Sequence, residues 1–169
     1  MRTILLFLNN MFISEIEDIR QKHDPLFGLI SPHITIVLPF ESSISNDELK
    51  LHIINVSKPI QNIEIEFTNQ ITSEREYLFL RVEKGKEQIE ELHNILYTGP
   101  LLQFLKEDIP YIPHVTVGRK ESAELAAEVV KEIPSFHGKL NCVIDRISVE
   151  RIGENGESII EFEVPFLKS

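Results

Sequence analysis

One short pattern occurs twice in this chain and limits the folds that the chain can adopt. Residues 32–36 read Pro-His-Ile-Thr-Ile, and residues 113–117 read Pro-His-Val-Thr-Val. Interleaved β-branched residues favour a strand, in which every second side chain lies on the same face. Each copy therefore predicts a strand with a histidine and a threonine on one face and aliphatic side chains on the other.

The two copies lie in different halves of the chain, and each half repeats the same order of elements. A motif strand is followed by a helix and then by a pair of strands. Two units are too few for a solenoid, so this weak repeat indicates a duplicated α+β unit whose motif strands meet across a cleft. No Gly/Ser-rich linker separates the halves. We therefore expect residues 1–169 to form a single domain made of two pseudo-symmetric lobes.

Hydrophobic periodicity, caps and turn residues predict the remaining elements. The expected strands cover residues 2–8, 33–40, 63–67, 77–82, 114–118, 136–143, 146–152 and 157–165. The expected helices cover residues 12–22, 45–57, 86–97 and 122–132, with serines at positions 45 and 122 as N-caps. In the last strand, alternation predicts one buried face and one more polar face.

The acidic composition limits what the protein can bind. Its formal net charge is -10 at pH 7, and no basic stripe runs along the sequence. A protein that binds along a duplex neutralises several phosphates and needs such a stripe. We therefore expect no long nucleic-acid footprint, and a compact site for one or two phosphates at most.

The N-terminal segment and the lone cysteine bear on where the protein resides. The apolar run in MRTILLFLNN is too short for a signal peptide, and no stretch approaches the ~20 apolar residues that span a bilayer. Cys142 lies in the apolar run LNCVI, so we expect a buried small hydrophobe rather than a reactive thiol. One cysteine cannot form an internal disulfide, which fits a reducing compartment. Together these features favour a cytoplasmic protein with no membrane partner.

Two imidazoles and two hydroxyls that converge on one small volume suit phosphoryl transfer. Imidazole titrates near neutral pH, so one neutral and one protonated histidine can act as base and acid. Threonine hydroxyls can hydrogen-bond the non-bridging oxygens of a phosphoryl group. The candidates are His33 and His114 for proton transfer, and Thr35 and Thr116 for binding the phosphate of a phosphodiester, above all a strained cyclic one.

The paired motifs resemble those of the two-histidine phosphoesterase superfamily, which includes 2′-5′ RNA ligase-like proteins and cyclic nucleotide phosphodiesterases. The segments DPLFGLISPHITI (24–36), LYTG (96–99) and YIPHVTVGR (111–119) are most similar to a small bacterial branch of it. This resemblance extends over essentially the whole chain in length and in the order of elements. It implies a bilobal α+β fold with antiparallel sheets around a central cleft flanked by helices.

The resemblance also implies an activity and roles for individual residues. The expected enzyme is a phosphoric ester hydrolase that acts on a cyclic phosphate or a 2′-5′ linkage of a nucleotide or RNA end, without metal or cofactor. His33 would be the proton donor and His114 the proton acceptor, although these roles can exchange with the direction of the reaction. Arg119 is a candidate phosphate ligand because related proteins often carry a basic residue near this position, and a solvated arginine at a strand end is the alternative.

Other interpretations remain open. The protein could bind nucleotides or RNA ends without turnover, although all four motif residues are intact. A metallohydrolase would use the two motif histidines as ligands, but neither motif has a nearby carboxylate or third histidine. Phe7, Tyr77 and Tyr97 could stack on a base, although aromatic residues at such spacing usually belong to the core or to a rim.

Overall fold

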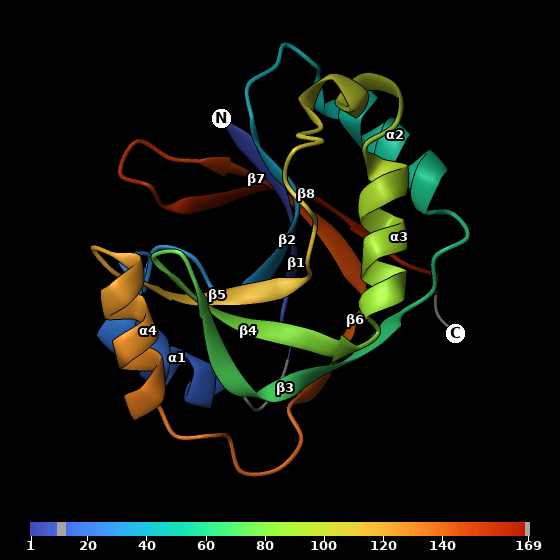
Figure 1. Cartoon of the computed structure of the whole chain (residues 1–169). Helices are drawn as coiled ribbons and strands as arrows, with labels where there is room; N and C mark the ends of the chain where they lie inside the picture. Colours follow the sequence, from blue (N-terminus) through green and yellow to red (C-terminus); the bar gives the residue numbers. More distant parts are fainter. Residues whose placement is uncertain (10–12, 168–169) are drawn as a thin grey trace.

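A computed structural model describes residues 1–9 and 13–167 of the chain. Within these residues the strands are β1 (Arg2–Phe7), β2 (His33–Phe40), β3 (Ile63–Glu74), β4 (Tyr77–Lys84), β5 (His114–Arg119), β6 (Asn141–Ile144), β7 (Arg146–Ile152) and β8 (Ser158–Pro165). They form one strongly curled sheet in the order β6-β3-β4-β5-β2-β1-β7-β8 (Figure 1). All neighbouring strands pair antiparallel, as we expected.

The helices of the described residues pack on the two halves of this sheet. α1 (Ile13–His23) packs on β5, and α4 (Ala123–Glu132) packs on β3 and β4. α2 (Asn46–Ser57) packs on α3 (Lys86–Leu96) and on β8, and α3 also packs on β2 (Figure 1). A 3-10 helix, η1 (Gly99–Phe104), follows α3 and contacts α2. The α+β class is thereby confirmed.

The two motif strands lie at the middle of the sheet, with three strands on each side of the pair. β2 and β5 join directly, with Ile34 opposite Val115. The resemblance implied separate antiparallel sheets around a cleft, whereas this pairing unites the two halves into one sheet. The physical reason is that each motif strand would otherwise leave a row of unpaired backbone groups at an edge.

The aliphatic faces of the motif strands form the centre of the core. Ile34, Ile36, Val115 and Val117 are all buried, whereas the motif histidines and threonines between them are only partly buried. This alternation is the one that the sequence predicts for a strand with one face on the core. The opposite face of β2 and β5 is thus left to carry polar side chains.

Most of the expected boundaries are confirmed to within a residue or two, and so are both N-caps. The Ser45 hydroxyl accepts a hydrogen bond from the backbone N–H of Glu48, and Ser122 does the same for Leu125. Each satisfies a donor of the first helical turn that has no partner within the helix. The expected start of the first helix at residue 12 lies outside the described residues.

Three expectations for the strands were wrong in part. β3 runs on to Glu74, because it pairs with the full length of β4, and β6 begins only at Asn141. The segment before it contains Gly138 at a φ of 92°, a left-handed conformation that interrupts a strand. β8 does not alternate cleanly, because its register with β7 shifts after Val149 and leaves Ile160 44% exposed. The sequence also missed η1.

Cys142 is buried, as the sequence predicts, and burial raises the pKa of its thiol to about 12. A thiol with such a pKa is not ionised at neutral pH and is therefore unreactive. No helix in the described part of the chain is both long enough and apolar enough to cross a bilayer.

Candidate active site

His33 and His114 are the first residues of the two central strands, and a backbone carbonyl oxygen two residues earlier contacts each imidazole in the same way. The Nδ1 atom of His33 lies 2.8 Å from the carbonyl oxygen of Ser31, and that of His114 lies 2.6 Å from the carbonyl oxygen of Ile112. Because a carbonyl oxygen only accepts hydrogen bonds, each Nδ1 must carry the proton. The Nε2 atom of each neutral ring is therefore left with a lone pair that can accept a proton.

The proline before each histidine explains why both rings have this geometry. Proline restricts the residue that precedes it to an extended conformation. The carbonyl oxygens of Pro32 and Pro113 then accept hydrogen bonds from the backbone N–H groups of Leu8 (3.2 Å) and Val82 (3.0 Å). Each motif is thus tied to the neighbouring strand immediately before its histidine.

The register of β2 against β5 brings the four motif side chains together. Because Ile34 lies opposite Val115, His33 falls opposite Thr116, and Thr35 falls opposite His114. Opposite side chains of an antiparallel pair have Cβ atoms about 4.5–5.5 Å apart. The two histidines and two threonines therefore form a compact cluster, with two side chains from each strand, on one face of the sheet.

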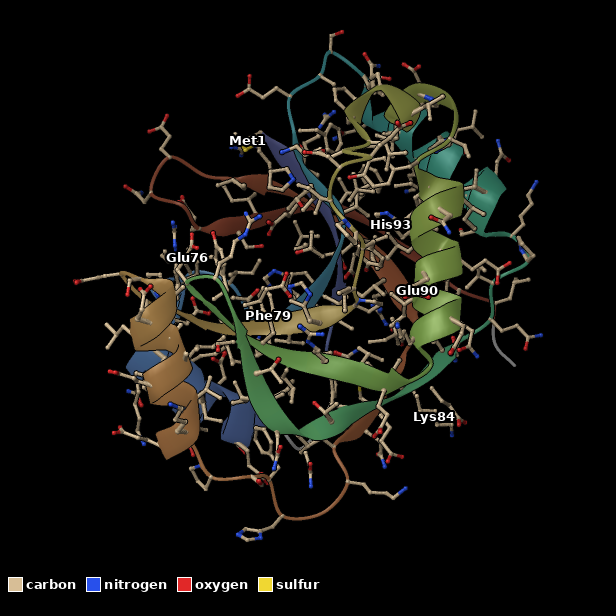
Figure 2. All side chains as sticks on the ribbon, in the orientation of Figure 1. Met1, Glu76, Phe79, Lys84, Glu90 and His93 are labelled. Atoms are coloured by element: carbon tan, nitrogen blue, oxygen red, sulfur yellow. The ribbon has the colours of Figure 1, made fainter. Side chains whose placement is uncertain are left out.

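Aromatic rings flank this cluster on both sides. Phe7 of β1 lies opposite His33, and Phe79 of β4 lies opposite Thr116. The Phe7 ring meets the His33 ring edge-on at 5.9 Å, and the Phe79 ring lies 3.9 Å from that of His114. Each catalytic candidate thus has an aromatic neighbour, and Figure 2 shows Phe79 on β4 in the interior of the curled sheet.

Arg81 lies directly opposite His114 on β4, and the sequence analysis missed it. Its guanidinium donates to the carboxylate of Glu74 at 3.0 Å, whereas its Nε is buried and has no hydrogen-bond partner among the described residues. A buried donor without an acceptor is rare in proteins and marks a place for a ligand acceptor or an ordered water. Alternation along YLFLRV, which places Arg81 on the same face as Tyr77 and Phe79, was a signal that could have found it.

A cavity of about 250 Å³ opens beside His114, and Thr35 and Thr116 help to line it. Its remaining wall is mainly apolar and aromatic, with one cation, and comprises Leu38, Tyr77, Phe79, His93, Tyr97, Leu105, Lys106, Ile109, Pro110, Tyr111 and Ile112. His33 and Arg119 do not belong to this wall. We call this space the His114 pocket.

Two tyrosines and a third histidine give the His114 pocket a rigid wall. The His93 ring stacks on Tyr111 at 3.7 Å with an angle of 6° between the planes, and its Nδ1 lies 2.8 Å from the carbonyl oxygen of Ile36. Figure 2 shows His93 on the side of α3 that faces the strands. The hydroxyl of Tyr111 donates to the carbonyl oxygen of Thr35 at 3.0 Å. These contacts join α3 and the segment before β5 to β2.

Tyr97 also contributes to this wall through its hydroxyl group. The Tyr97 hydroxyl accepts a hydrogen bond from the backbone N–H of Leu38 at 3.0 Å, and the side chain is buried. Its ring packs edge-on against His93. Tyr97 therefore acts mainly as a core residue, the alternative that the sequence analysis favoured for such aromatics.

Burial lowers the pKa of both candidate catalytic histidines below the ordinary value of 6.5. For His114 the nearby guanidinium of Arg81 lowers the pKa further, and for His33 the charges of Arg20 and His114 do so. Both rings are therefore neutral at neutral pH when the site is empty. A bound phosphate would favour the charged form of one of them, because opposite charges raise the pKa of an imidazole.

Arg119 is brought to the same face as the motif by an irregularity in β5. Arg119 lies opposite Tyr77 and Thr116 lies opposite Phe79, so Val117 is the extra residue of a bulge. A regular strand would have placed Arg119 on the aliphatic face with Val117. The bulge therefore makes Arg119 a neighbour of the cluster, which alternation alone did not predict.

Arg119 nevertheless lies at the rim of the site rather than inside it. Its guanidinium lies 5.2 Å above the ring of Tyr77 and 3.5 Å from the carboxylate of Glu76, and 54% of the side chain is exposed. An exposed ion pair of this kind contributes little to stability. The Arg119 guanidinium is thus held only weakly in its present place.

The described residues also bear on a metal site. Across residues 1–9 and 13–167, no group of three or more His, Cys, Asp or Glu side chains is placed to hold a metal ion.

Comparison with known proteins identifies the family. A family model described as the 2′-5′ RNA ligase superfamily matches residues 10–156. The chain belongs to the 2′-5′ RNA ligase superfamily. Sequence relatives include a protein of Bacillus licheniformis, named "putative phosphoesterase", that is 27% identical over 158 residues and aligns over 90% of each chain. A protein of Geobacillus thermodenitrificans with the same name is 27% identical over 159 residues, which covers 90% of this chain and 88% of that protein.

Solved structures with low sequence identity to this chain share its fold. The crystal structure of E. coli LigT complexed with 3′-AMP superimposes with a TM-score of 0.66 at 13% identity, over 98% of this chain and 97% of LigT. The LigT complex with NADP+ gives a TM-score of 0.63 at 15% identity, over 98% and 96% of the two chains. The match to the family model confirms the superfamily that the paired motifs indicated.

Proposed function

We propose that this member of the superfamily cleaves a cyclic phosphate or a 2′-5′ phosphodiester of a nucleotide or RNA end, with His33 and His114 as a metal-independent acid and base. One observation carries the proposal. Two imidazoles with the same tautomer, each with a free Nε2, share one face of the sheet with two threonine hydroxyls. We further propose that the chain is one domain whose two lobes meet at this site.

The reaction needs one neutral and one protonated imidazole. His114 takes a proton from the attacking water or ribose hydroxyl, whose oxygen forms a bond to phosphorus. The bond from phosphorus to the leaving oxygen breaks, and protonated His33 gives its Nε2 proton to that oxygen. His114 ends protonated and His33 neutral, and exchange with solvent restores the starting state. Each transfer contributes typically ~10²–10⁴ to the rate.

The surroundings of the two rings support this division of roles. His114 has a cation opposite it, Arg81, which disfavours a second positive charge and keeps this ring neutral, as a base must be. His33 has the uncharged Phe7 ring in the corresponding place. Arg20 also lowers the pKa of His33 and the Asp24 carboxylate raises it, so the negative charge of a bound phosphate is what would keep His33 protonated as the acid.

Phosphate oxygens have several donors to bind in this arrangement. Thr35 and Thr116 can donate to the non-bridging oxygens through their hydroxyls, and the partly exposed guanidinium of Arg81 can donate to one of them. Arg119 at the rim can bind a phosphate oxygen or the next phosphate along a chain. Developing charge would then be stabilised from both strands at once.

The His114 pocket suits the base or ribose of a nucleotide. Tyr77 and Phe79 stack on each other with an interplanar angle of 9°, and both line the pocket. Aromatic rings of this kind bind bases through stacking, which does not depend on base identity. The LigT structures with 3′-AMP and NADP+ support a nucleotide as ligand.

The test is a screen of 2′,3′-cyclic nucleotides and 2′-5′-linked oligonucleotides in buffer with EDTA. We expect turnover that EDTA leaves unchanged and that His33→Ala and His114→Ala each lower by about 10²–10⁴. His137→Ala is the matched control, since His137 is an exposed histidine away from the cluster. Wild-type rates in both motif variants would overturn the mechanism, and tight binding of a cyclic phosphate without product would favour a binding protein.

A further inference from the structure

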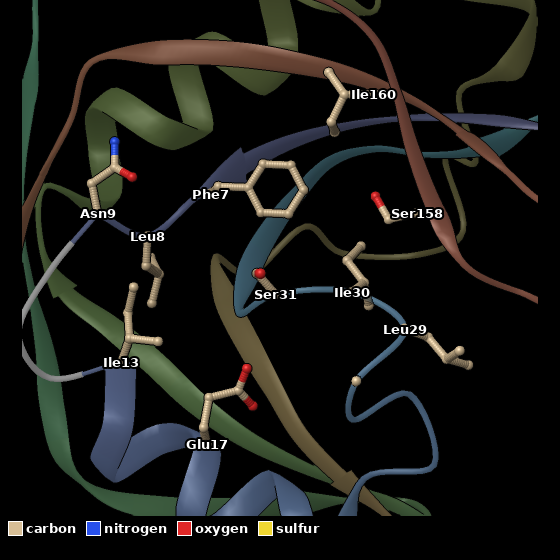
Figure 3. Close-up of a pocket in the computed structure, with 11 residues that line it drawn as sticks. Phe7, Leu8, Asn9, Ile13, Glu17, Leu29, Ile30, Ser31, Ser158 and Ile160 are labelled. Atoms are coloured by element: carbon tan, nitrogen blue, oxygen red, sulfur yellow. The ribbon is translucent and has the colours of Figure 1, made fainter.

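A second hollow, of about 550 Å³, lies on the opposite side of the histidine pair, next to His33. Its walls come from the end of β1, the start of α1, the segment that leads into β2, and β8 (Figure 3). Phe7, Ile30, Ser31, Ser158 and Ile160 are among the residues that line it. We call this space the His33 hollow.

The His33 hollow adjoins His33 through two of its wall residues, although His33 itself does not line it. Phe7, which projects into the hollow in Figure 3, is the ring that contacts His33. Ser31, another wall residue, supplies the carbonyl oxygen that holds Nδ1 of His33. A group bound in the hollow would therefore lie beside the imidazole that we propose protonates the leaving oxygen.

A buried arginine holds in place the segment between α1 and β2, which forms one wall of the hollow. Arg20 is 1% exposed and donates to the carbonyl oxygens of Leu26 and Ile30 and to the carboxylate of Asp24. The backbone N–H of Ser158 on β8 donates to the carbonyl oxygen of Leu29 at 2.9 Å. The segment between α1 and β2 is thus fixed from both sides.

The chemistry of the wall indicates an uncharged occupant. Among the described residues that line it, the charged one is Glu17, whose carboxylate lies 2.9 Å from the guanidinium of Arg20. Ile160 presents an apolar surface there and is 44% exposed, against the alternation expected for β8. The His114 pocket, by contrast, has Lys106 in its wall and lies beside Arg81. A ligand with further phosphates is favoured on the His114 side, and a neutral group on the His33 side.

We propose that the His33 hollow is a second subsite, which binds the uncharged nucleoside on the leaving-group side of the scissile phosphate. The preferred substrate is then a phosphodiester with a group on each side, such as a 2′-5′-linked dinucleotide, rather than a cyclic mononucleotide. A cyclic mononucleotide with its base in the His114 pocket reacts in the reverse sense: His33 takes a proton from water, whose oxygen bonds to phosphorus, the bond from phosphorus to one ribose oxygen breaks, and His114 protonates that oxygen. Water then stands where the second nucleoside would lie, and the hollow holds no nucleoside. This inference rests on the proposed function for the position of the phosphate.

The test compares two substrates in two matched variants. Ile160→Trp fills the hollow from the edge strand β8, and Val143→Trp places the same side chain on β6, the edge strand at the other end of the sheet, where Val143 is 46% exposed. The substrates are 2′-5′-linked adenylyl-adenosine and adenosine 2′,3′-cyclic phosphate. We expect Ile160→Trp to lower kcat/KM for the dinucleotide by about tenfold or more, the size of a lost apolar contact, and to leave the cyclic substrate within about twofold. Val143→Trp should change neither.

Binding measurements separate this inference from the proposed function. Affinity of the same dinucleotide for the His114→Ala protein is measured by calorimetry, with and without Ile160→Trp. Loss of affinity with Ile160→Trp supports the subsite even if the wild-type protein turns over neither substrate, a result that would overturn the function alone. Equal effects of Ile160→Trp on both substrates, or no effect on dinucleotide affinity, would overturn the subsite and leave the two-histidine mechanism standing.

Discussion

The surroundings of His33 and of His114 differ although their local sequences are nearly the same. Both rings follow a proline, donate Nδ1–H to the carbonyl two residues earlier and have an aromatic neighbour. Only His114 has a cation, Arg81, opposite it in the sheet. Repeated local sequence thus produces repeated geometry, whereas the guanidinium that lowers the pKa of each ring comes from a different place, Arg81 on the neighbouring strand for His114 and Arg20 on α1 for His33.

The segments that lead into the two histidines are also anchored by different interactions. Before His33, the buried guanidinium of Arg20 binds backbone carbonyls and the Asp24 carboxylate. Before His114, the ring of Tyr111 stacks on His93. Removal of one partner of a buried ion pair strongly lowers the stability of the fold, because the other charge is left buried without a counter-charge. The His33 side should therefore be the more sensitive of the two to a single substitution.

The largest expected effect is on catalysis, where the pH dependence of kcat/KM distinguishes the role of His33 from that of His114. A base must be neutral, so its titration sets the acidic limb of kcat/KM, and an acid must be protonated, so it sets the alkaline limb. His114→Ala should therefore flatten the acidic limb and His33→Ala the alkaline limb, each with a rate loss of about 10²–10⁴. The measurement is kcat/KM for the 2′-5′-linked dinucleotide from pH 5 to 9. An exchange of the two limbs would reverse the roles that we assign.

Removal of the Arg20 side-chain charge should be the most damaging change to stability. Arg20→Met leaves Asp24, whose side chain is 5% exposed, without its cation at 2.7 Å. We expect a loss of about 3–5 kcal/mol in the free energy of unfolding, measured by urea denaturation. Arg146→Met removes two partly exposed ion pairs, with Asp145 and with Glu163, and should cost no more than about 1 kcal/mol. Equal losses in the two variants would show that the segment before His33 does not depend on Arg20.

Arg81→Gln tests the asymmetry between the two sites directly. Loss of the guanidinium should lower kcat/KM by about 10- to 100-fold, because a charge-assisted hydrogen bond to phosphate is lost. It should also raise the pKa of His114, which Arg81 lowers, and change that of His33 less. NMR titration of the ring protons measures both pKa values. Arg151→Gln, on β7, is the control, and unchanged titration of His114 in Arg81→Gln would refute the asymmetry.

The smallest expected effect, counted for each side chain, is the contribution of one buried histidine to the pH dependence of stability. Burial lowers the pKa of His33, His114 and His93 in the folded protein, so just below pH 6.5 the unfolded chain binds more protons. Stability rises with pH wherever the unfolded state binds more protons. It should thus fall as the pH drops from 6.5 toward 5, by at most about 1.4 kcal/mol per pH unit for each ring.

Two substitutions test this pH dependence, one of a buried histidine and one of an exposed histidine as the control. His93→Gln should reduce the slope of the free energy of unfolding between pH 6.5 and 5, whereas His137→Gln, at an exposed position, should leave it unchanged. The slope is read from urea denaturation at several pH values. A slope that His93→Gln leaves unchanged would mean that burial of this ring does not control the titration.

Much of the candidate site could be predicted from local sequence, because the signals act over a few residues. Alternation placed His33 with Thr35 and His114 with Thr116, and the structure has both pairs on one face. The capping serines likewise identified two helix starts. Arg81 carried a weaker signal, since alternation gives its face on β4 but not its neighbour on β5.

By itself, the sequence determined which side chains share a face and how each histidine is held, because backbone alternation and proline act locally. Only the tertiary structure decided that β2 pairs with β5, that Arg81 lies opposite His114 and that a bulge turns Arg119 toward the cluster. These features depend on strand register between distant segments. Register is set by how the whole sheet buries its apolar face, and no short stretch of sequence contains that information.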